Sequence, residues 1–307
     1  GSVAPAPARS PAWYSVTDAF SPPDGVRRRR ERLGGIGVLR GTCGTRFQAS
    51  NGSAMIANPE LGSKGGSMRA ILLAAGVGSR IASHIGDMPK SLVDVGGEHL
   101  IERTVKMLRA NHMEITVVTG YKHALIEDVL APYEVDVIYN PFYKVTNSMG
   151  SLWMARDRIR GDEIMIANAD VFYEQTLLDK AFASAQKAFL VRDTNRVDEG
   201  DYIFLTDNGR LLKYGKQLTR DERDSEYVGF AFLRQDWVSR FRERLLGMVE
   251  AGDYELWWEN VLYSFVDEGV HEVQTLDIAG EFWAEVDTLE DYNRILAYVA
   301  AKQAAGA

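Results

Sequence analysis

The sequence predicts an α/β fold with a mostly parallel central sheet flanked by helices, and a smaller antiparallel region beside it. From Met68 onward, short apolar segments alternate with segments of helical periodicity, which is the pattern of βαβ units. After Asp170 the pattern changes to short strand-like segments separated by turns such as Asp207-Asn208-Gly209, which is typical of antiparallel hairpins. We expect both parts to form one continuous domain, 68–307.

The first half supplies the alternating elements. Ile101, Val105 and Leu108 recur at the i, i+4, i+7 spacing of a helix face. The short apolar and β-branched runs between the helical segments are typical of buried strands. The expected strands are Ala70–Leu73, Ile115–Val118, Val135–Tyr139 and Glu163–Ala167, and the expected helices are His99–His112, Ala124–Leu130 and Met149–Arg156.

The second half is expected to form the antiparallel region and the closing helices. Its strand-like segments are Ala188–Val191, Tyr202–Leu205, Leu211–Tyr214, Tyr227–Leu233, Val270–Leu276 and Phe282–Val286. Its helical segments are Trp237–Glu250, Tyr254–Glu268 and the alanine-rich Leu289–Ala305.

Residues 1–67 have a different composition from the rest of the chain. They are rich in Pro, Gly, Ala, Ser and Arg, include Arg27-Arg28-Arg29-Arg30, and lack sustained periodicity. Their last residues, Gly62-Ser63-Lys64-Gly65-Gly66-Ser67, are typical of a flexible linker. We expect a disordered or artificially added leader with Met68 as the natural start, and an arginine-rich targeting or docking arm is the alternative.

Composition and charge exclude several classes of function. The 307 residues are 46% hydrophobic and 25% charged, and the net charge of −8 disfavours a general nucleic-acid binder. The single cysteine, Cys43, excludes an intramolecular disulfide, and the five histidines lack the spacing of zinc ligands. No apolar run approaches the ~20 residues of a membrane span. We expect a soluble cytoplasmic protein that binds neither nucleic acid nor membrane, with a homodimer as an open possibility.

A glycine-rich turn follows the first expected strand. Gly76 and Gly78 carry no side chains, so backbone N–H groups there can approach a polyanion closely. Arg80 and Lys90 then supply positive charge for phosphate oxygens. The spacing matches neither the dinucleotide fingerprint nor the Walker loop. This combination predicts a triphosphate site, and a structural turn with solvated cations is the alternative.

Three acidic residues are candidate metal ligands. Asp170 ends an apolar strand, where burying a carboxylate without a partner is costly. Glu285 and Asp287 lie two apart, so on a strand their side chains would share a face. A hard divalent cation bound to phosphates needs only one or two protein carboxylates. We therefore expect Mg²⁺ at Asp170, Asp287 and Glu285, against the alternatives of a strand-end turn at Asp170 and a helix N-cap at Asp287.

These motifs carry a resemblance to a known superfamily. Leu73-Ala74-Ala75-Gly76-Val77-Gly78-Ser79-Arg80 followed by Pro89-Lys90-Ser91-Leu92 resembles the nucleotidyltransferases of the MobA-like and sugar-nucleotidyltransferase-like type, which have a Rossmann-like sheet. Within it, several segments look like the phosphocholine and phosphonate cytidylyltransferase branch. They are Tyr139-Asn140-Pro141-Phe142-Tyr143, 147–152, Lys213-Tyr214-Gly215-Lys216, Glu226-Tyr227-Val228-Gly229, Trp257-Trp258-Glu259-Asn260 and Glu285-Val286-Asp287-Thr288. The likeness covers roughly 68–297.

The resemblance implies a Mg²⁺-dependent transfer of CMP from CTP to a small phosphate or phosphonate acceptor, with release of pyrophosphate. It implies roles for these residues: catalytic, Arg80, Lys90 and Lys216; nucleotide-binding, Leu73, Ala75, Gly76, Gly78, Ser79, Gly150 and Ser151; acceptor-binding, Asn147, Glu226, Trp257 and Trp283; metal-binding, Asp170, Asp287 and Glu285. Where the family commonly has Asp-Ala-Asp, this chain has Asn168-Ala169-Asp170, so a second carboxylate is absent at that position.

The acceptor stays open at the level of sequence. Tyr254, Trp257, Trp258 and Trp283 are candidates for an aromatic cage around a quaternary ammonium group, but aromatics at helical spacing are more often core residues. The sequence therefore does not distinguish among choline, ethanolamine and aminoethyl acceptors. The competing functions are a sugar-1-phosphate nucleotidyltransferase that uses UTP or dTTP, and a non-catalytic nucleotide sensor.

Overall fold

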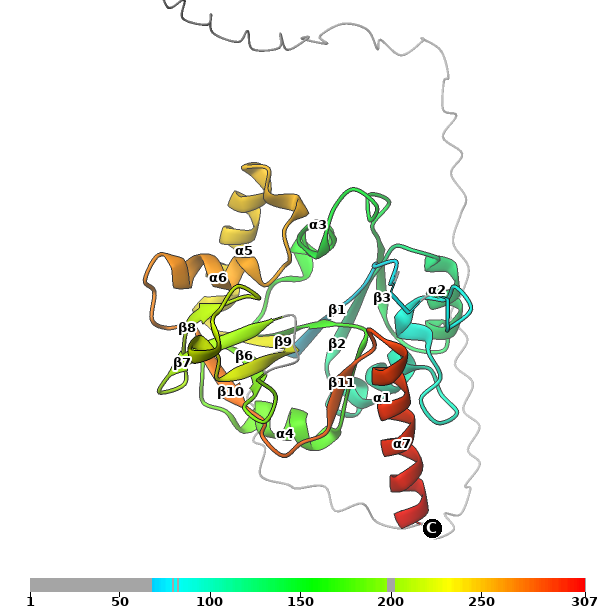
Figure 1. Ribbon diagram of the computed structural model, residues 1–307. Helices are drawn as coiled ribbons and strands as arrows, with labels where there is room; N and C mark the ends of the chain where they lie inside the picture. Colours follow the sequence, from blue (N-terminus) through cyan, green and yellow to red (C-terminus); the bar gives the residue numbers. More distant parts are fainter. Residues whose placement is uncertain (1–67, 79, 82, 198–201, 307) are drawn as a thin grey trace, which may run out of the picture. The chain divides into compact units, whose positions relative to one another are not determined.

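The computed structural model describes residues 68–78, 80–81, 83–197 and 202–306 (Figure 1). These residues fall within one compact unit. The expected leader, 1–67, lies outside the described residues. Among the described helices, none combines the length and the apolar character needed to cross a membrane.

Four parallel strands form the first half of the main sheet. They are β1 (Met68–Ala74), β2 (Glu114–Thr119), β3 (Asp136–Tyr139) and β4 (Glu163–Asn168), in the order β3-β2-β1-β4. Side chains on alternate positions of β1 enter different cores, with Ala70 and Leu72 on one face and Ile71 on the other. Burial on both faces is the usual state of a parallel sheet and explains the continuous apolar runs in these strands.

The sheet continues into strands that are mostly antiparallel. Its order runs on from β4 as β9-β6-β10-β8-β7, with β6 (Ala188–Asp193), β7 (Ile203–Asp207), β8 (Arg210–Tyr214), β9 (Ser225–Arg234) and β10 (Gln274–Asp277). Strand β9 is antiparallel to β4 and β6, and its first residues also pair with β7. Asn208 and Gly209 both have positive φ, as a tight turn between β7 and β8 requires. The nine-stranded sheet is therefore mixed, and the expected parallel arrangement holds mainly for β1 to β4.

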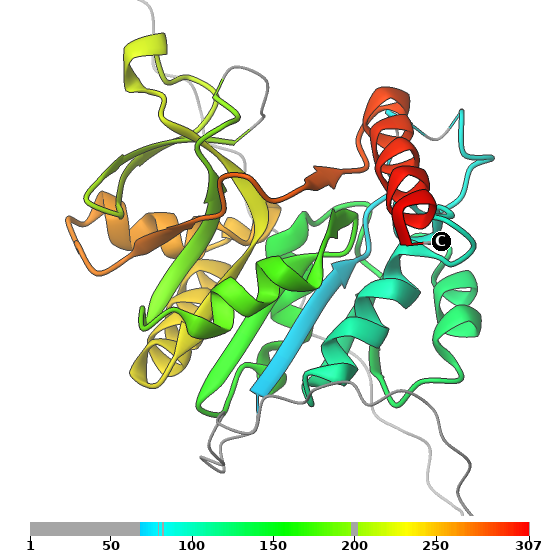
Figure 2. The ribbon, with the colours of Figure 1, turned by 90° about the horizontal axis from the view of Figure 1, so that it is seen from below.

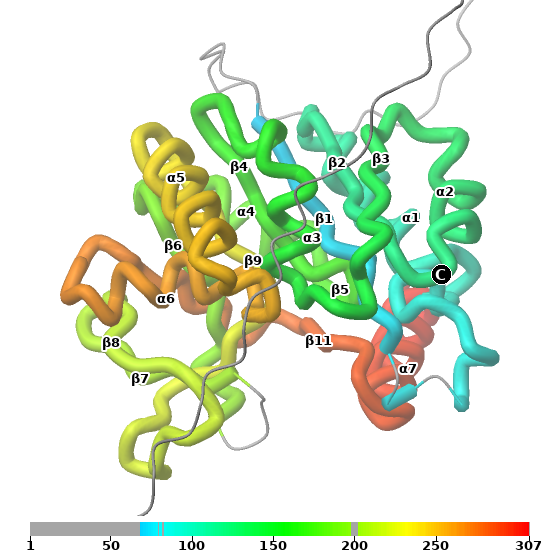
Figure 3. The backbone as a smooth tube through the Cα atoms, turned by 90° about the horizontal axis from the view of Figure 1, so that it is seen from above, coloured from blue at the N-terminus to red at the C-terminus, as the bar shows by residue number. Residues whose placement is uncertain are grey.

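Helices cover both faces of the sheet (Figures 2 and 3). On one face, α1 (Leu100–Ala110), α2 (His123–Leu130) and α4 (Gln175–Ala183) contribute to one hydrophobic core. On the other face, α3 (Ser148–Met154), α5 (Asp236–Glu250) and α6 (Asn260–Asp267) contribute to a second. The amphipathic periodicity of α1 matches this placement, because Ile101, Val105 and Leu108 are all fully buried.

A small second sheet connects the two halves of the chain. It consists of β5 (Val171–Tyr173) and β11 (Trp283–Glu285), which are antiparallel. The backbone N–H of Val286 donates to the carbonyl of Asp170 at 2.9 Å. The closing helix α7 (Leu289–Gly306) buries Ile295 in a third core together with Phe172, Ala284 and Val286. This packing brings the end of β11 beside the end of β4.

One expected helix is wrong, and two elements were not expected. The segment expected as the helix Tyr254–Glu268 contains a 3₁₀ turn, Asp253–Glu255, and α6 begins only at Asn260. The carbonyls of Tyr254 and Leu256 accept hydrogen bonds from Asn147 and Met149 at the start of α3, so they are not available to a local helix. Strand β5 and helix α4 occupy a stretch in which no element was expected.

Candidate active site

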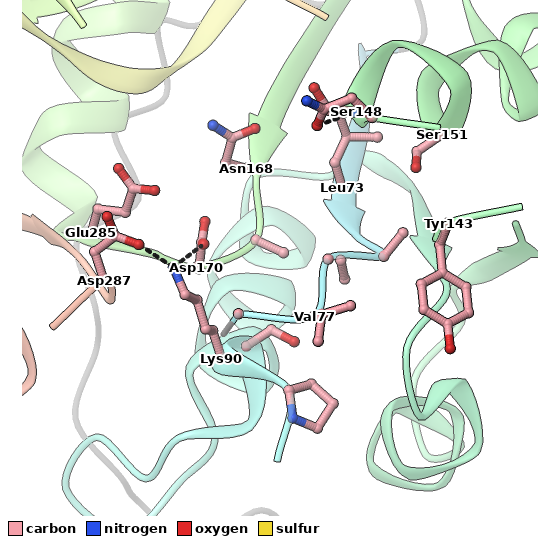
Figure 4. A pocket seen from close by; sticks show the side chains of 18 of the residues that line it. Leu73, Val77, Lys90, Tyr143, Ser148, Ser151, Asn168, Asp170, Glu285 and Asp287 are labelled. Atoms are coloured by element: carbon pink, nitrogen blue, oxygen red, sulfur yellow. Dashed lines mark hydrogen bonds and ion pairs between the residues drawn. The ribbon is translucent and has the colours of Figure 1, made fainter. Parts of the chain in front are cut away.

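A cavity of about 380 Å³ opens at the carboxyl ends of β1 and β4 (Figure 4). This is the edge at which ligands of parallel α/β sheets bind. Its volume lies within the usual range for sites that hold small molecules. Twelve of the residues expected in a site line it: Leu73, Ala75, Gly76, Gly78, Arg80, Lys90, Asn147, Ser151, Asp170, Trp257, Glu285 and Asp287.

The glycine turn forms one wall of the cavity. A Cβ atom added at Gly76 would meet nothing within 4 Å, so the backbone there faces open space. Gly78 has a φ of +63°, and a Cβ atom added there would lie 2.6 Å from Cγ of Lys90. Gly78 is thus required both by its backbone conformation and by the close packing of the Lys90 side chain. Ser79, expected to bind the nucleotide, lies outside the described residues.

Lys90 lies among the three expected metal ligands. Its ammonium group is hydrogen-bonded to Oδ1 of Asp287 and lies 3.6 Å from Oδ2 of Asp170, as Figure 4 shows. Arg80 Nη1 lies 2.5 Å from the other oxygen of Asp287. Glu285 lines the same cavity beside them. Two cations and three carboxylates therefore meet at one point.

The electrostatics of this cluster show an excess of negative charge. Burial lowers the pKa of Lys90, but the attraction of Asp170, Asp287 and Glu285 outweighs this effect, so its pKa lies above the usual value. Burial raises the pKa of Glu285 to about 8, and repulsion from Asp170 and Asp287 adds to the effect. The site therefore stabilises positive charge and disfavours a third ionised carboxylate.

The carboxylates fit a metal that is shared with a substrate rather than one caged by protein. In the described part of the chain, no group of three or more His, Cys, Asp or Glu side chains is arranged to hold a metal ion by itself. The Lys90 ammonium between Asp170 and Asp287 nevertheless shows that a cation is stable at this position. Two carboxylates with phosphate oxygens are a common environment for Mg²⁺.

The opposite wall is the loop after β3 together with the start of α3. Asn140, which is 1% exposed, donates through Nδ2 to Oγ of Ser151 at 3.0 Å and accepts from the backbone of Phe142 at 2.9 Å. Asn147 caps α3 by accepting from the N–H of Ser148. Gly150 is buried within α3, where a Cβ atom would lie 2.5 Å from Cβ of Thr146, so it shapes the wall without lining the cavity.

Asn168 lies at the base of the cavity and has fixed partners. Its Oδ1 accepts from the indole N–H of Trp258 at 2.9 Å, and an indole can only donate. The amide nitrogen of Asn168 is therefore directed at Oε1 of Glu259, 3.4 Å away. Burial raises the pKa of Glu259 to about 7, so this carboxyl is partly protonated near neutral pH. An aspartate at position 168 would place a second carboxylate against Glu259, which explains why asparagine suits this chain.

The four remaining expected residues lie outside the cavity wall: Gly150, Lys216, Glu226 and Trp283. Glu226 is paired with Arg196, Nε to Oε2, at 2.7 Å. Trp283 lines a separate, smaller cavity. The four aromatics proposed as a cage are not brought together, because Trp258 is fully buried in the core and Trp257 is 47% exposed at the cavity rim. Asp287 is not the cap of α7, since Thr288 accepts from the N–H of Asp291.

The structure adds residues to which the sequence assigned no role. They are Ala74, Val77, Pro89, Ser91, Tyr143, Thr146, Ser148, Asn168 and Ala169. The signal for Tyr143, Thr146 and Ser148 was the break Asn140-Pro141 after β3, because a loop at the carboxyl end of a parallel strand faces the ligand site. Val77 lies inside the glycine-rich turn that the sequence already marked as a candidate site.

Comparisons with known proteins agree with this geometry. Residues 70–245 match the family described as MobA-like NTP transferase domain. The chain is similar to CTP:phosphoglutamine cytidylyltransferase of Campylobacter jejuni, with 26% identity over 73% of this chain and 97% of the relative. It is also similar to choline-phosphate cytidylyltransferase of Haemophilus influenzae, with 28% identity over 75% of this chain and 96% of the relative.

Solved structures show the same fold. The CTP:phosphocholine cytidylyltransferase of Streptococcus pneumoniae superposes with a TM-score of 0.62 at 18% identity, over 76% of this chain and 99% of that chain. The matched family, the shared fold and the cavity at the strand ends lead to one assignment. This chain belongs to the MobA-like NTP transferase domain family and is a nucleotidyltransferase.

Proposed function

We propose that this protein transfers CMP from CTP to a phosphate or phosphonate oxygen of a small acceptor and releases pyrophosphate. The observation that carries the proposal is the position of Lys90. It lies between Asp170 and Asp287 and packs against Gly78 of the glycine turn, so one cavity combines a polyanion wall with a cation and two metal-type carboxylates.

The reaction needs little covalent chemistry from the protein. An acceptor oxygen, already anionic, attacks the α-phosphorus of CTP, and the bond from that phosphorus to the bridging oxygen of the β-phosphate breaks. The electron pair leaves with pyrophosphate, so no general base is required. Catalysis then consists of holding two polyanions together and neutralising charge in the transition state. Lys90 and Arg80 line the cavity, and we assign this role to them.

A divalent metal fits the residues present. Asp170 and Asp287 would hold Mg²⁺ together with phosphate oxygens, and Glu285 lies beside them. When bound, the metal supplies positive charge to the triphosphate. On nucleotide binding, Lys90 and Arg80 then exchange carboxylate partners for phosphate oxygens, while Gly78 leaves room for the Lys90 side chain to stay against the turn.

The names of the relatives support CTP and a small phosphorylated acceptor. We place the base against the wall formed by Ser151 and its neighbour Gly150, and the acceptor near Asn147 and Trp257. Lys216, on the loop after β8, is proposed to contact the acceptor phosphate when that loop folds over the cavity. In the structure Lys216 accepts a hydrogen bond through its carbonyl from Arg223.

The test is a matrix of the four NTPs against phosphocholine, 2-aminoethylphosphonate, inositol phosphate and glucose-1-phosphate, read by pyrophosphate release. We expect release that requires both CTP and a phosphate or phosphonate acceptor. Activity with UTP or dTTP and glucose-1-phosphate, but not with CTP, would favour a sugar-1-phosphate nucleotidyltransferase. Nucleotide binding without release from any pair would favour a sensor.

A further inference from the structure

One side of the active-site cavity is charged and the other is not. Lys90 and the three carboxylates lie together on one side, and Figure 4 shows Tyr143 and Ser151 on the other. The lining residues of this second side come from the loop after β3 and from the start of α3, and they are Tyr143, Thr146, Asn147, Ser148 and Ser151. A nucleotide combines a charged triphosphate with an uncharged base, so its base suits the uncharged side.

Asn140, buried next to Ser151, can hold only one orientation of its side-chain amide. Its Oδ1 faces the backbone N–H of Phe142 at 2.9 Å. A backbone N–H can only donate, so the amide atom that faces it must be the oxygen. The amide nitrogen of Asn140 therefore lies on the side of α3.

Both hydrogens of this amide nitrogen have acceptors. Nδ2 of Asn140 lies 3.0 Å from Oγ of Ser151 and 3.2 Å from Oγ1 of Thr146. The Thr146 hydroxyl donates its own hydrogen to the carbonyl of Phe142 at 3.0 Å. Because an amide nitrogen donates and does not accept, the Ser151 oxygen is the acceptor of its hydrogen bond with Asn140.

The hydrogen of the Ser151 hydroxyl is then left for a ligand. Within the residues that the structure describes, no group accepts this hydrogen. Ser151 is only 4% exposed, yet it lines the cavity. A buried donor without an acceptor is unfavourable, so this position favours a ligand atom that accepts a hydrogen bond.

Cytosine and uracil differ in this property at the ring nitrogen N3. In cytosine N3 is an acceptor, whereas in uracil N3 carries a hydrogen and is a donor. The oxygen O2 is an acceptor in both bases, so a hydrogen bond to O2 would not distinguish them. A hydroxyl that is fixed as a donor pairs with N3 of cytosine and opposes the N3–H of uracil.

We propose that Ser151 donates its hydroxyl hydrogen to N3 of the cytosine base, and that Asn140 is the positioning residue that fixes Ser151 as a donor. Asn140 acts only through Ser151 and does not touch the nucleotide. The inference rests on the proposed function, and it names the residues that select CTP over UTP.

Three nucleotides test the contact: CTP, UTP and 3-deaza-CTP, in which a C–H group replaces N3. With wild-type protein, Mg²⁺ and the best acceptor, we expect kcat/KM for CTP to exceed that for each of the others by about tenfold to a hundredfold. In Ser151→Ala both ratios should fall by about tenfold, because the donor is gone. The comparison with 3-deaza-CTP isolates N3, since UTP also differs from CTP at position 4 of the ring. Ratios that stay unchanged in folded Ser151→Ala would overturn the proposal.

Asn140→Asp separates a positioning role from a structural one. At pH 8 the introduced carboxylate can only accept, so the Ser151 hydroxyl donates to it and turns its lone pairs to the base. The value of kcat/KM should then rise for UTP and fall for CTP, chiefly through KM. A variant that is merely distorted loses activity with both nucleotides alike, and a CTP-to-UTP ratio that does not fall refutes the role of Asn140.

Asn293→Asp is the matched control, because Asn293 is exposed on α7 and lines neither cavity. Its CTP-to-UTP ratio should equal that of the wild type. Circular dichroism verifies the fold of each variant. If Asn140→Asp does not fold, the comparison of CTP with 3-deaza-CTP in wild type and Ser151→Ala still decides the proposal.

Failure of the proposed function has a different signature. If no acceptor supports pyrophosphate release, CMP transfer is refuted, and calorimetric titration with CTP and with 3-deaza-CTP, each with Mg²⁺, then decides the contact alone. Tighter binding of CTP by the wild type that is lost in Ser151→Ala supports the contact, and equal binding of both nucleotides by the wild type refutes it. A wild-type preference for CTP in catalysis that both variants keep refutes only this inference.

Discussion

Lys90 is stabilised in the protein by the same carboxylates that are proposed to hold the metal. Its ammonium group contacts Asp287 and Asp170, and Arg80 contacts Asp287 from the other side. The side chain of Lys90 is only 12% exposed, so these contacts are little screened by solvent. A cation held in place before the reaction contributes more to the transition state than one that must be reoriented.

We expect Lys90→Ala to lower kcat by about a hundredfold to a thousandfold, the usual effect of removing one preorganised group that stabilises transition-state charge. The measurement is pyrophosphate release from CTP with the best acceptor, together with circular dichroism to verify the fold. Lys106→Ala is the control, because Lys106 is half exposed and pairs with Glu98 and Glu102, neither of which lines the cavity. A kcat close to wild type in folded Lys90→Ala would refute the catalytic role of Lys90.

Glu259 makes the stability of the protein depend on pH. Burial raises its pKa to about 7 in the folded state from an ordinary value of 4.5. As the pH rises, the Glu259 carboxyl loses its proton at a lower pH in the unfolded chain than in the folded protein. Ionisation of Glu259 therefore favours unfolding. The free energy of unfolding should therefore fall by about 3 kcal/mol as the pH rises from about 4.5 to about 7, and then level off.

Comparing wild type with Glu259→Gln isolates this effect, because glutamine keeps the shape and cannot ionise. In urea unfolding between pH 4.5 and 8, the variant should lose less stability with rising pH than the wild type. Glu255→Gln, on the exposed 3₁₀ turn, should follow the wild-type profile. Parallel profiles for wild type and Glu259→Gln would contradict the raised pKa.

At the scale of elements, the turn after β1 works only with glycine at position 78. An alanine there would need a φ of +63° and would press its Cβ against the Lys90 side chain. We expect Gly78→Ala to destabilise the fold by about 1–2 kcal/mol and to raise the KM for CTP. Urea unfolding and steady-state kinetics measure the two effects.

A glycine-to-alanine substitution in α5 should change the stability of the fold in the opposite direction. A Cβ atom at Gly247 meets nothing within 4 Å, and Gly247 lies in a helix, where alanine is preferred by about 0.5–1 kcal/mol. Gly247→Ala should therefore stabilise the fold and leave the KM unchanged. If Gly78→Ala were as stable and as active as the wild type, the turn would not depend on its left-handed conformation.

At the scale of the whole molecule, we expect nucleotide binding to link the glycine turn to the β5–β11 sheet. Ligands that bind only the folded state stabilise it by about 2.7 kcal/mol at a hundred times Kd. For a unit of this size, that corresponds to a rise in Tm of about 5 to 10 °C. We expect this rise with CTP and Mg²⁺, and a much smaller one when EDTA replaces Mg²⁺, because Asp170 and Asp287 then repel the triphosphate.

Thermal unfolding with CTP, with ATP and without nucleotide checks this expectation. ATP at the same concentration serves as the control for base selectivity. An equal shift with and without the chelator would contradict a metal shared between the carboxylates and the nucleotide.

The sequence by itself determined the local elements and the glycine turn that forms one wall of the cavity. The apolar run of β1, the glycines after it and Lys90 lie close together in the chain, so their conformations follow from local sterics and periodicity. The same holds for the turn at Asn208-Gly209 and for the amphipathic face of α1. The strand Tyr227–Leu233 was expected in the antiparallel part, and β9 is antiparallel, but the local pattern did not indicate that β9 pairs with β4 within the same sheet.

Only the tertiary structure decided which distant residues share a site. Pairing of β5 with β11, fixed by the packing of α7, brings Asp287 to Asp170. The hydrogen bonds from α3 to Tyr254 and Leu256 prevented a helix there, and the core took Trp258 out of the expected cage. Neither Glu226 nor Trp283 lines the first cavity, because Glu226 is paired with Arg196 and Trp283 lines a separate, smaller cavity. Local patterns encode conformation, whereas proximity between distant residues depends on how all the elements pack together.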